Sequence, residues 1–357
     1  MILIKKKSFI LSFFLLIVFI YGLILCYGLT LNYLDIDFYE TNSIPTDSFR
    51  ILTSIEKIDF IQISFLDILL DFNNIGYKAF IYYFFSEDSI IDFYKLFFFN
   101  FLVLIFTYKL VLSYVDSNNF FFLFLFPIFS FYSIFPNKDF YPLCFSVFLF
   151  HYLINKNYIL IFIYSVFIFL MRAHIGVIGF FVFLKMKIRF NLFYCILIIF
   201  LLSNFLNIYI DPSKYYVLWL TRNPESNYFL SKIFYILNDL SLIPLFGVLF
   251  QAIKGFLNFF LSFFSLFDSH KFYDHFFLTV SIFSNSLLFF FFVYSNLKYK
   301  KKFINMNKPF YFGILFSFFI ISISSMPQPR YFLFLFFPML MYLNLFRRFC
   351  KENESFK

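Results

Sequence analysis

Apolar runs of membrane-spanning length recur along almost the whole chain and limit its possible folds more than any other feature. Of the 357 residues, 62% are hydrophobic and only 14% are charged, whereas soluble domains are nearer to half apolar and a quarter charged. A helix needs roughly 17–25 apolar residues to cross a bilayer. The sequence shows no strand alternation at ten-residue spacing, the pattern of a membrane barrel. We therefore predict an all-α, polytopic integral membrane protein.

The apolar runs predict about ten core transmembrane helices within a single transmembrane domain covering 1–357. The first run follows three lysines and is too long for the apolar part of a signal peptide, so an uncleaved helix is expected. The segment 241–267 is interrupted by Pro244 and two glycines and is expected to be a re-entrant segment or a helix pair. The core helices are expected near 8–30, 94–114, 119–135, 139–154, 157–171, 173–185, 190–209, 275–296, 309–325 and 330–346.

The basic residues indicate how the chain is oriented. With both termini inside, the inner segments hold about 16 cations and few carboxylates, and the outer segments hold about 12 cations and about 17 carboxylates. This distribution predicts a membrane protein with both termini in the cytoplasm. It also accounts for the net charge of +9, so no nucleic-acid partner is expected. The 71 Phe residues are interpreted mainly as lipid-facing side chains.

Two large outer-face loops are expected, at about 31–91 and 210–274. The first loop is acidic, and its stretch 58–85 mixes apolar residues with Asp, which suits helices lying in the membrane interface. Asp35 and Asp37 follow the first helix directly and are candidate general bases, because burial beside an apolar surface would raise the pKa of a carboxyl group. The alternative is that they are solvated loop carboxylates.

Three short outer turns, 136–139, 172–174 and 327–330, each place a cation at the end of an apolar run. Arg172 follows a run of only about fourteen residues, so its turn should lie below the lipid headgroups, where an ionisable side chain is costly and indicates function. The alternative is that Arg172 extends to a lipid phosphate. Arg330 follows two prolines that restrict the backbone, and extension to a lipid phosphate is again the alternative.

The turn 136–139 contains an adjacent Lys138 and Asp139. Lys138 could bind phosphate, and Asp139 could simply cap the helix that follows. Arginine suits phosphate because its planar fork donates two hydrogen bonds at once. No nucleotide-binding fingerprint is present and the four cysteines have no metal-ligand spacing. The pattern therefore favours a lipid-linked pyrophosphate substrate reached from the outer face.

The whole chain resembles the Wzy-type O-antigen and capsular polysaccharide polymerases of Gram-negative bacteria, including the EpsG-like branch. The likeness lies in size, helix number, high Phe, Ile and Tyr usage, a large late outer loop and sparse outer-face Arg. The turn 136–139 (Pro-Asn-Lys-Asp) resembles the short Lys-Glu/Asp turn of the family, and 172–174 (Arg-Ala-His) resembles its Arg turn. Residues 328–331 (Gln-Pro-Arg-Tyr) resemble its last outer-face motif.

The resemblance implies a protein of the bacterial inner (cytoplasmic) membrane. It also implies that two undecaprenyl-pyrophosphate-linked repeat units are joined at the periplasmic face, with no metal or nucleotide cofactor. Arg172, Lys138 and Arg330 would then stabilise the leaving pyrophosphate. Arg222 could hold glycan or phosphate, and His174 is a further substrate-binding candidate. Asp139, Asp35 or Asp37 would be the base. The lipid bilayer and a Wzz-type chain-length regulator are the expected partners, and Arg172→Ala is expected to abolish polymerisation at normal protein level.

Three alternatives remain open at this stage. A GT-C glycosyltransferase that uses a polyprenyl-phosphate sugar donor would share the acidic outer loop, and that loop resembles the GT-C outer-face architecture. A lipid-linked oligosaccharide flippase or other transporter should show repeat symmetry, and no repeat is found in the sequence. A membrane acyltransferase would need a His/Arg site reachable from the cytoplasm, which the charge distribution does not suggest.

Overall fold

The computed structural model describes residues 2–33, 35–37, 46–55, 75–87, 90–115, 126–188, 276–298, 308–322 and 329–354, and these form mostly helices. The α-helices are α1 (Ile2–Leu31), α3 (Thr46–Ile55), α5 (Ile75–Phe85), α6 (Phe93–Tyr114), α7 (Pro127–Tyr132), α8 (Phe140–Ile154), α9 (Tyr158–Met171), α10 (Ala173–Ile188), α16 (Phe276–Lys298), α18 (Lys308–Ser322) and α19 (Phe336–Glu354). A 3₁₀ helix, η3 (Pro329–Leu335), precedes α19, and β1 (Ser86–Glu87) pairs antiparallel with β2 (Ile90–Ile91). The expectation of a mostly helical fold is therefore confirmed.

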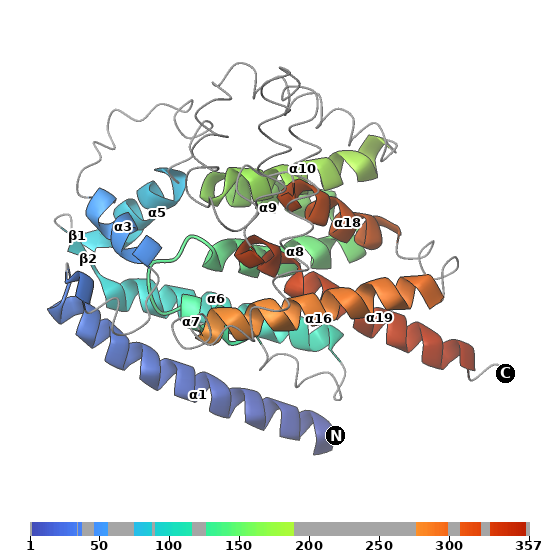
Figure 1. Ribbon diagram of the computed structural model, residues 1–357, viewed down its shortest axis with the longest axis horizontal. Helices are drawn as coiled ribbons and strands as arrows, with labels where there is room; N and C mark the ends of the chain where they lie inside the picture. The colour runs from blue at the N-terminus through green and yellow to red at the C-terminus, as the bar shows by residue number, and fades with distance from the viewer. Residues whose placement is uncertain are drawn as a thin grey trace, which may run out of the picture.

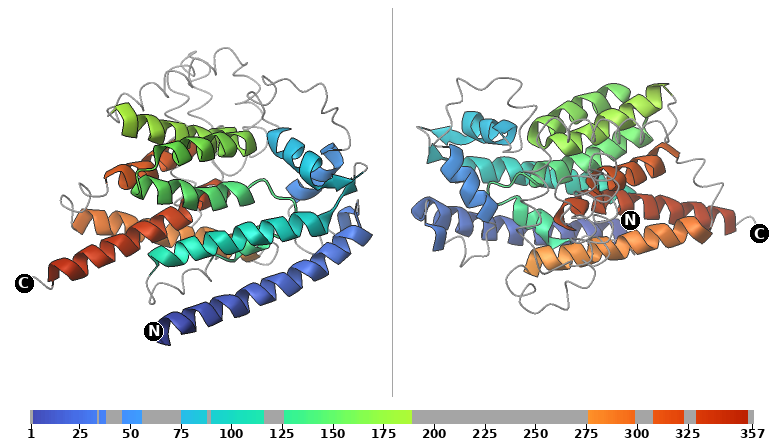
Figure 2. Two further views of the ribbon diagram at one scale, coloured as in Figure 1. Left: turned by 180° about the vertical axis from the view of Figure 1, so that it is seen from behind. Right: turned by 45° about the horizontal axis from the view of Figure 1, so that its top comes forward.

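The long helices run along one common direction, and both chain termini lie at the same end of the bundle (Figure 1). The opposite end, called the distal end below, carries β1, β2, α3 and α5 (Figure 1). Two further views show the same arrangement of α1, α6 and α19 (Figure 2). Placement of both termini at one end agrees with an even number of membrane crossings between them.

Within the described residues, four helices are long and apolar enough to cross a membrane. They cover Phe9–Leu31, Phe93–Tyr114, Phe276–Leu297 and Phe332–Lys351. Shorter apolar helices cover Phe140–Asn155, Tyr158–Met171 and Ile175–Leu184. The helix expected at 190–209 and the interrupted segment 241–267 lie outside the described residues.

Prolines set the starts of several helices, because the first turn is where a missing backbone N–H costs nothing. Pro142 lies in the first turn of α8, and Pro338 lies in the first turn of α19. The expectation of one helix over 330–346 is therefore wrong at its start: η3 covers Pro329–Leu335 and the α-helix begins only at Phe336. A regular α-helix through Pro338 would place its ring against the carbonyl of Phe334.

The helix expected over 119–135 also ends earlier than predicted. α7 covers only Pro127–Tyr132, and residues 119–125 lie outside the described part. The chain from 133 to 139 is a non-helical connection, buried over 133–137, which includes Phe135 and Asn137. Pro136 explains this break, because the residue before a proline avoids the α conformation and the proline itself donates no hydrogen bond.

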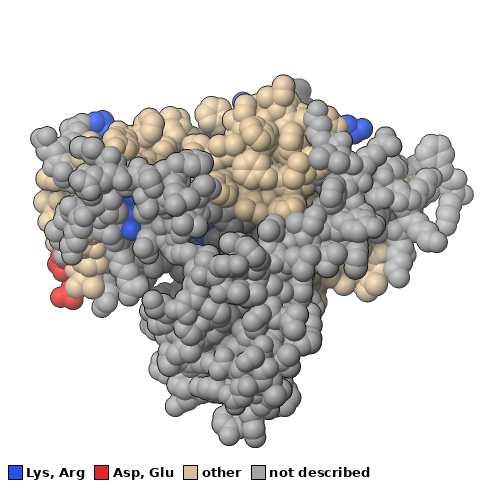
Figure 3. Space-filling model, turned by 90° about the horizontal axis from the view of Figure 1, so that it is seen from above, with Lys and Arg blue, Asp and Glu red and all other residues tan. Residues whose placement is uncertain are grey.

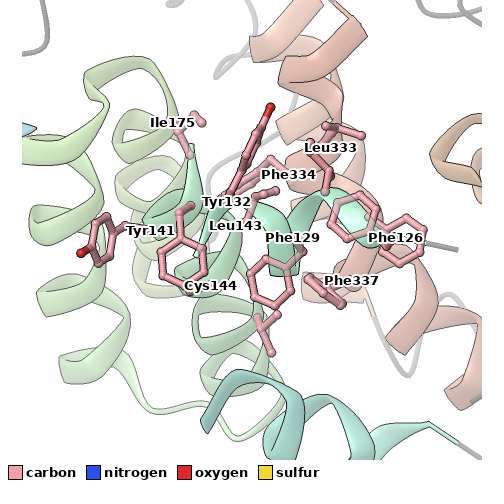
Figure 4. Close-up of a cluster of buried hydrophobic side chains, with 14 of the residues drawn as sticks. Phe126, Phe129, Tyr132, Tyr141, Leu143, Cys144, Ile175, Leu333, Phe334 and Phe337 are labelled. Carbon is pink, nitrogen blue, oxygen red and sulfur yellow. The ribbon is translucent and has the colours of Figure 1, made fainter. Parts of the chain in front are cut away.

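Aromatic side chains fill the interior of the bundle. Phe126 stacks on Phe336 with ring centroids 4.0 Å apart, and Phe129 of α7 packs edge-to-face on Phe337 of α19 at 4.9 Å. Figure 4 shows Phe129 and Phe337 within the buried cluster. The interpretation of Phe as mainly lipid-facing therefore holds for α1 and the exposed side of α6, where Phe9 and Phe106 are exposed, but is wrong for this core.

Candidate functional site

The backbone around Arg172 is fixed by both helices that it joins. Arg172 is the C-cap of α9, with φ −159° and ψ 93°, and its N–H donates to the carbonyl oxygen of Ile168 at 2.7 Å. Its own carbonyl oxygen accepts hydrogen bonds from the backbone N–H groups of Ile175 at 3.0 Å and Gly176 at 3.1 Å in α10. One residue thus ends α9 and begins α10, which makes the turn as short as the sequence suggests.

Small residues let α9 and α10 pack closely behind this turn. A Cβ added at Gly179 would collide with the Ser165 side chain, and one added at Gly176 would collide with Phe169. Close contact through small residues is a common way for membrane helices to associate. The 14 residues of α9 rise only about 21 Å, less than the hydrocarbon thickness of about 30 Å. A turn at the end of such a helix is expected to lie below the headgroup level.

The turn before α8 positions Asp139 by a local hydrogen bond. The side-chain oxygen of Asn137 accepts from the backbone N–H of Asp139 at 2.8 Å, and the carbonyl oxygen of Asn137 accepts from Phe140 N–H at 3.2 Å. Asp139 is the N-cap residue of α8, but its side chain makes no capping hydrogen bond. Asp139 therefore takes the N-cap position, but its side chain does not cap the helix with a hydrogen bond.

The Asp139 carboxylate instead forms an ion pair with the Arg172 guanidinium. The Arg172 side chain is 6% exposed and the Asp139 side chain 13% exposed, so the pair lies inside the bundle. This burial contradicts the alternative in which Arg172 extends to a lipid phosphate. Two candidate residues that the sequence placed in separate turns are thus brought into direct contact.

Helix α5, from the first loop, packs beside this ion pair. Gly76 approaches α9 so closely that an added Cβ would collide with the carbonyl oxygen of Leu170, two residues before Arg172. The Tyr77 side chain is fully buried and lies near the backbone of Asn137. Burial raises the pKa of Tyr77, and the nearby Asn137 backbone lowers it by less, so its hydroxyl stays protonated. Of the stretch 58–85, where interface helices are expected, the structure describes only α5, which packs on the bundle. Residues 56–74 lie outside the described part.

A second polar contact joins α8 to α6. The Tyr141 hydroxyl, in the first turn of α8, donates a hydrogen bond to the side-chain oxygen of Asn100 on α6, and both residues are buried. The Tyr141 and Tyr77 rings lie 6.1 Å apart between centroids. The sequence analysis did not single out Tyr77, Tyr141 or Asn100. Asn100 carried a usable signal, since a polar residue within an apolar membrane helix is uncommon and usually finds a partner.

The other candidate residues have different positions. Lys138 is half-buried in the turn before α8. Asp35 and Asp37 are exposed just after α1, where Asp35 accepts from the backbone N–H of Asp37 at 3.0 Å. In Figure 3 the acidic side chains on the visible face lie at the left, the end at which Figure 1 shows β1, β2 and α3. Because both side chains are exposed, the structure favours their interpretation as solvated loop carboxylates.

Three candidates have side chains outside the described part. Arg330 lies in η3, and His174 lies in the first turn of α10, but only their backbones are described. Arg222 falls wholly outside the described residues. The structure therefore brings together Asp139 and Arg172, with Lys138 adjacent in sequence to Asp139. Among the described residues, no group of His, Cys, Asp and Glu could hold a metal ion.

The hydropathy and the fold define a helical membrane protein with a buried acid–base pair between two helix ends. No protein-family model, curated protein or solved structure matches the chain. The chemistry of the pair is therefore the main guide to function. A guanidinium in a buried site can bind an anion with two parallel hydrogen bonds, and a carboxylate can accept a proton.

Proposed function

We propose that the chain is a polysaccharide polymerase that joins undecaprenyl-pyrophosphate-linked oligosaccharide repeat units, for an O-antigen or a capsule. In this proposal it crosses the bacterial inner membrane about ten times, with both termini in the cytoplasm and the distal end in the periplasm. The observation that carries the proposal is the buried Asp139–Arg172 pair. A charged pair below the headgroup level is costly and is by default a functional-site hypothesis.

The proposed reaction is a glycosyl transfer between two lipid-linked substrates. A sugar hydroxyl of the acceptor unit attacks the anomeric carbon of the donor's first sugar, and the bond from that carbon to the pyrophosphate oxygen breaks. The electron pair leaves with undecaprenyl pyrophosphate, and Asp139 takes the hydroxyl proton. Arg172 stabilises the charge that develops on the leaving group, as expected for a positioned donor in a site that excludes water.

Lys138 would add a second positive charge near the leaving pyrophosphate, because it precedes Asp139 in the same turn. Arg330, Arg222 and His174 remain proposed substrate-binding residues on the strength of the sequence pattern. A Wzz-type chain-length regulator remains a proposed partner. No cofactor is required in this scheme, because the pyrophosphate leaving group activates the donor sugar.

A GT-C glycosyltransferase with a polyprenyl-phosphate sugar donor is the second candidate. The packing of α5 next to the ion pair favours it, since an outer-loop helix beside a carboxylate resembles the outer-face arrangement expected of that superfold. The two candidates share acid–base chemistry and differ in the leaving group. The lipid product separates them, because a polymerase releases undecaprenyl pyrophosphate and a GT-C enzyme releases a polyprenyl monophosphate.

The test uses the purified full chain in nanodiscs with undecaprenyl-pyrophosphate-linked repeat units. Wild type should give a ladder of chain lengths and release undecaprenyl pyrophosphate, while Arg172→Ala should give only single units. Arg172→Ala/Asp139→Ala also lacks the proposed base and should give only single units, so its yield of folded protein, compared with that of Arg172→Ala, measures the effect of an uncompensated charge. Lys95→Ala, which removes a half-exposed cation on α6, should keep the ladder. A full ladder from the Arg172→Ala protein would refute the assignment.

A further inference from the structure

We infer that the donor's pyrophosphate displaces the Asp139 carboxylate from Arg172, and that this exchange makes Asp139 available as the base only when the donor is bound. The inference rests on the proposed function. It concerns how the site is controlled, because in this structure the candidate base, Asp139, is ion-paired with the candidate anion-binding residue, Arg172.

Arg172 has little room for a second anion while Asp139 is bound. The Arg172 side chain is only 6% exposed, and its guanidinium is ion-paired with Asp139, which lies in the turn before α8. If a pyrophosphate bound beside the intact pair, one guanidinium would face both the pyrophosphate and the carboxylate, and the buried cluster would carry a large net negative charge. Such a charge is unfavourable where little water is present to solvate it. Replacing the carboxylate with a phosphate oxygen keeps one anion on the guanidinium, so exchange is favoured over addition.

The local structure allows Asp139 to leave without breaking α8. The Asp139 side chain makes no capping hydrogen bond to the helix, and its backbone N–H is held by the side chain of Asn137. Rotation about the Cα–Cβ bond of Asp139 can therefore move the carboxylate away while the helix start remains in place. The chain before it, from 133 to 139, is non-helical and ends at Asp139.

The exchange also changes the chemistry of Asp139. A carboxylate in contact with a guanidinium is stabilised in its ionised form and holds a proton poorly. Once the pyrophosphate has taken its place on Arg172, Asp139 can accept the hydroxyl proton of the acceptor sugar as the new glycosidic bond forms. The proton then passes to water after the leaving pyrophosphate has departed. Donor binding and base activation are coupled because both use the same guanidinium.

The coupling predicts that removing the carboxylate strengthens donor binding while it weakens catalysis. The experiment measures binding of undecaprenyl pyrophosphate, and separately of undecaprenyl phosphate, to the full chain in nanodiscs. Asp139→Asn and Asp139→Ala should bind undecaprenyl pyrophosphate more tightly than wild type, by roughly 5- to 150-fold, the range typical of coupled sites. Both variants should lose chain extension. Asp139→Asn/Arg172→Gln should bind as weakly as Arg172→Gln alone.

Asp92→Asn is the matched control. Asp92 also pairs with a cation, Lys95, but the two atoms are 4.0 Å apart and the side chains are 32% and 52% exposed. This variant should leave binding unchanged. Equal or weaker pyrophosphate binding by folded Asp139→Asn and Asp139→Ala would overturn the exchange. Failure of wild type and all variants to bind undecaprenyl pyrophosphate, or preference for undecaprenyl phosphate, would overturn the proposed function and the exchange with it.

Discussion

The Asp139 carboxylate at the start of α8 contacts the Arg172 guanidinium at the end of α9, where 13% and 6% of the two side chains are exposed. Each residue lies at a helix end, and neither helix would need that residue to be charged. A buried pair of this kind costs several kcal/mol in desolvation before its attraction is counted. Its presence inside a mostly apolar bundle is better explained by chemistry than by stability.

The first prediction concerns the stability of the pair. Arg172→Ala should destabilise the protein by about 3–5 kcal/mol, because it leaves the Asp139 carboxylate buried without its partner. Arg172→Ala/Asp139→Ala should be less destabilised than the sum of the single variants. Denaturant unfolding in detergent micelles measures both. This cost revises the expectation that Arg172→Ala leaves protein level normal.

Lys95→Ala provides the control for that cycle, because its exposed pair with Asp92 should contribute less than about 1 kcal/mol. Equal losses for Arg172→Ala and Lys95→Ala would contradict the burial of the Asp139–Arg172 pair.

The second prediction tests the contact between α5 and α9. Gly76→Val should place its side chain against the Leu170 carbonyl oxygen and force the two backbones apart. Overpacking of this kind typically costs about 1–3 kcal/mol, and here it should also lower activity because the Arg172 turn follows Leu170 directly. Gly313→Ala is the control, since its added Cβ would meet the Phe150 ring, away from the pair. A wild-type rate of chain extension by Gly76→Val would argue against a role for α5 at the site.

The third prediction concerns the buried hydrogen bond between Tyr141 and Asn100. Tyr141→Phe removes the hydroxyl and leaves the Asn100 side-chain oxygen buried without its donor. Hydrogen bonds between membrane helices average about 0.6 kcal/mol and reach about 1.7 kcal/mol, so a loss within this range is expected in thermal unfolding. Asn100→Leu/Tyr141→Phe removes both polar groups and should recover part of the loss. No recovery would indicate that the two residues act independently.

The fourth prediction tests orientation. In a background without cysteines, Asp37→Cys should react with a membrane-impermeant maleimide added to intact spheroplasts, and Lys156→Cys should react only after the membrane is broken. Both positions are exposed, so access to solvent is matched and the side of the membrane decides the outcome. Labelling of Lys156→Cys in intact spheroplasts would reverse the predicted topology.

Helix positions could be predicted because the length and spacing of apolar runs are local properties. The runs expected at 139–154 and 157–171 match α8 and α9 within a residue or so at each end. The errors fall where proline competes with hydropathy. Pro136 separates α7 from α8, and Pro338 delays the start of α19, although the residues on both sides of Pro338 are apolar.

The candidate site was predicted only as separate residues. Arg172 and Asp139 were each identified from a short turn beside an apolar run, but hydropathy gives no information on which turns meet in space. The structure pairs these two, leaves Asp35 and Asp37 in solvent, and adds Tyr77 and Asn100 from other segments. The sequence left Asp139, Asp35 and Asp37 as alternative candidates for the base.

The sequence by itself determined that this is a helical membrane protein, because an apolar run of sufficient length must satisfy its backbone hydrogen bonds within one helix. It also determined where cations interrupt those runs. Only the tertiary structure decided that one cation and one carboxylate share a buried site. Their contact depends on how α8 packs against α9, and such contacts arise between segments rather than within them.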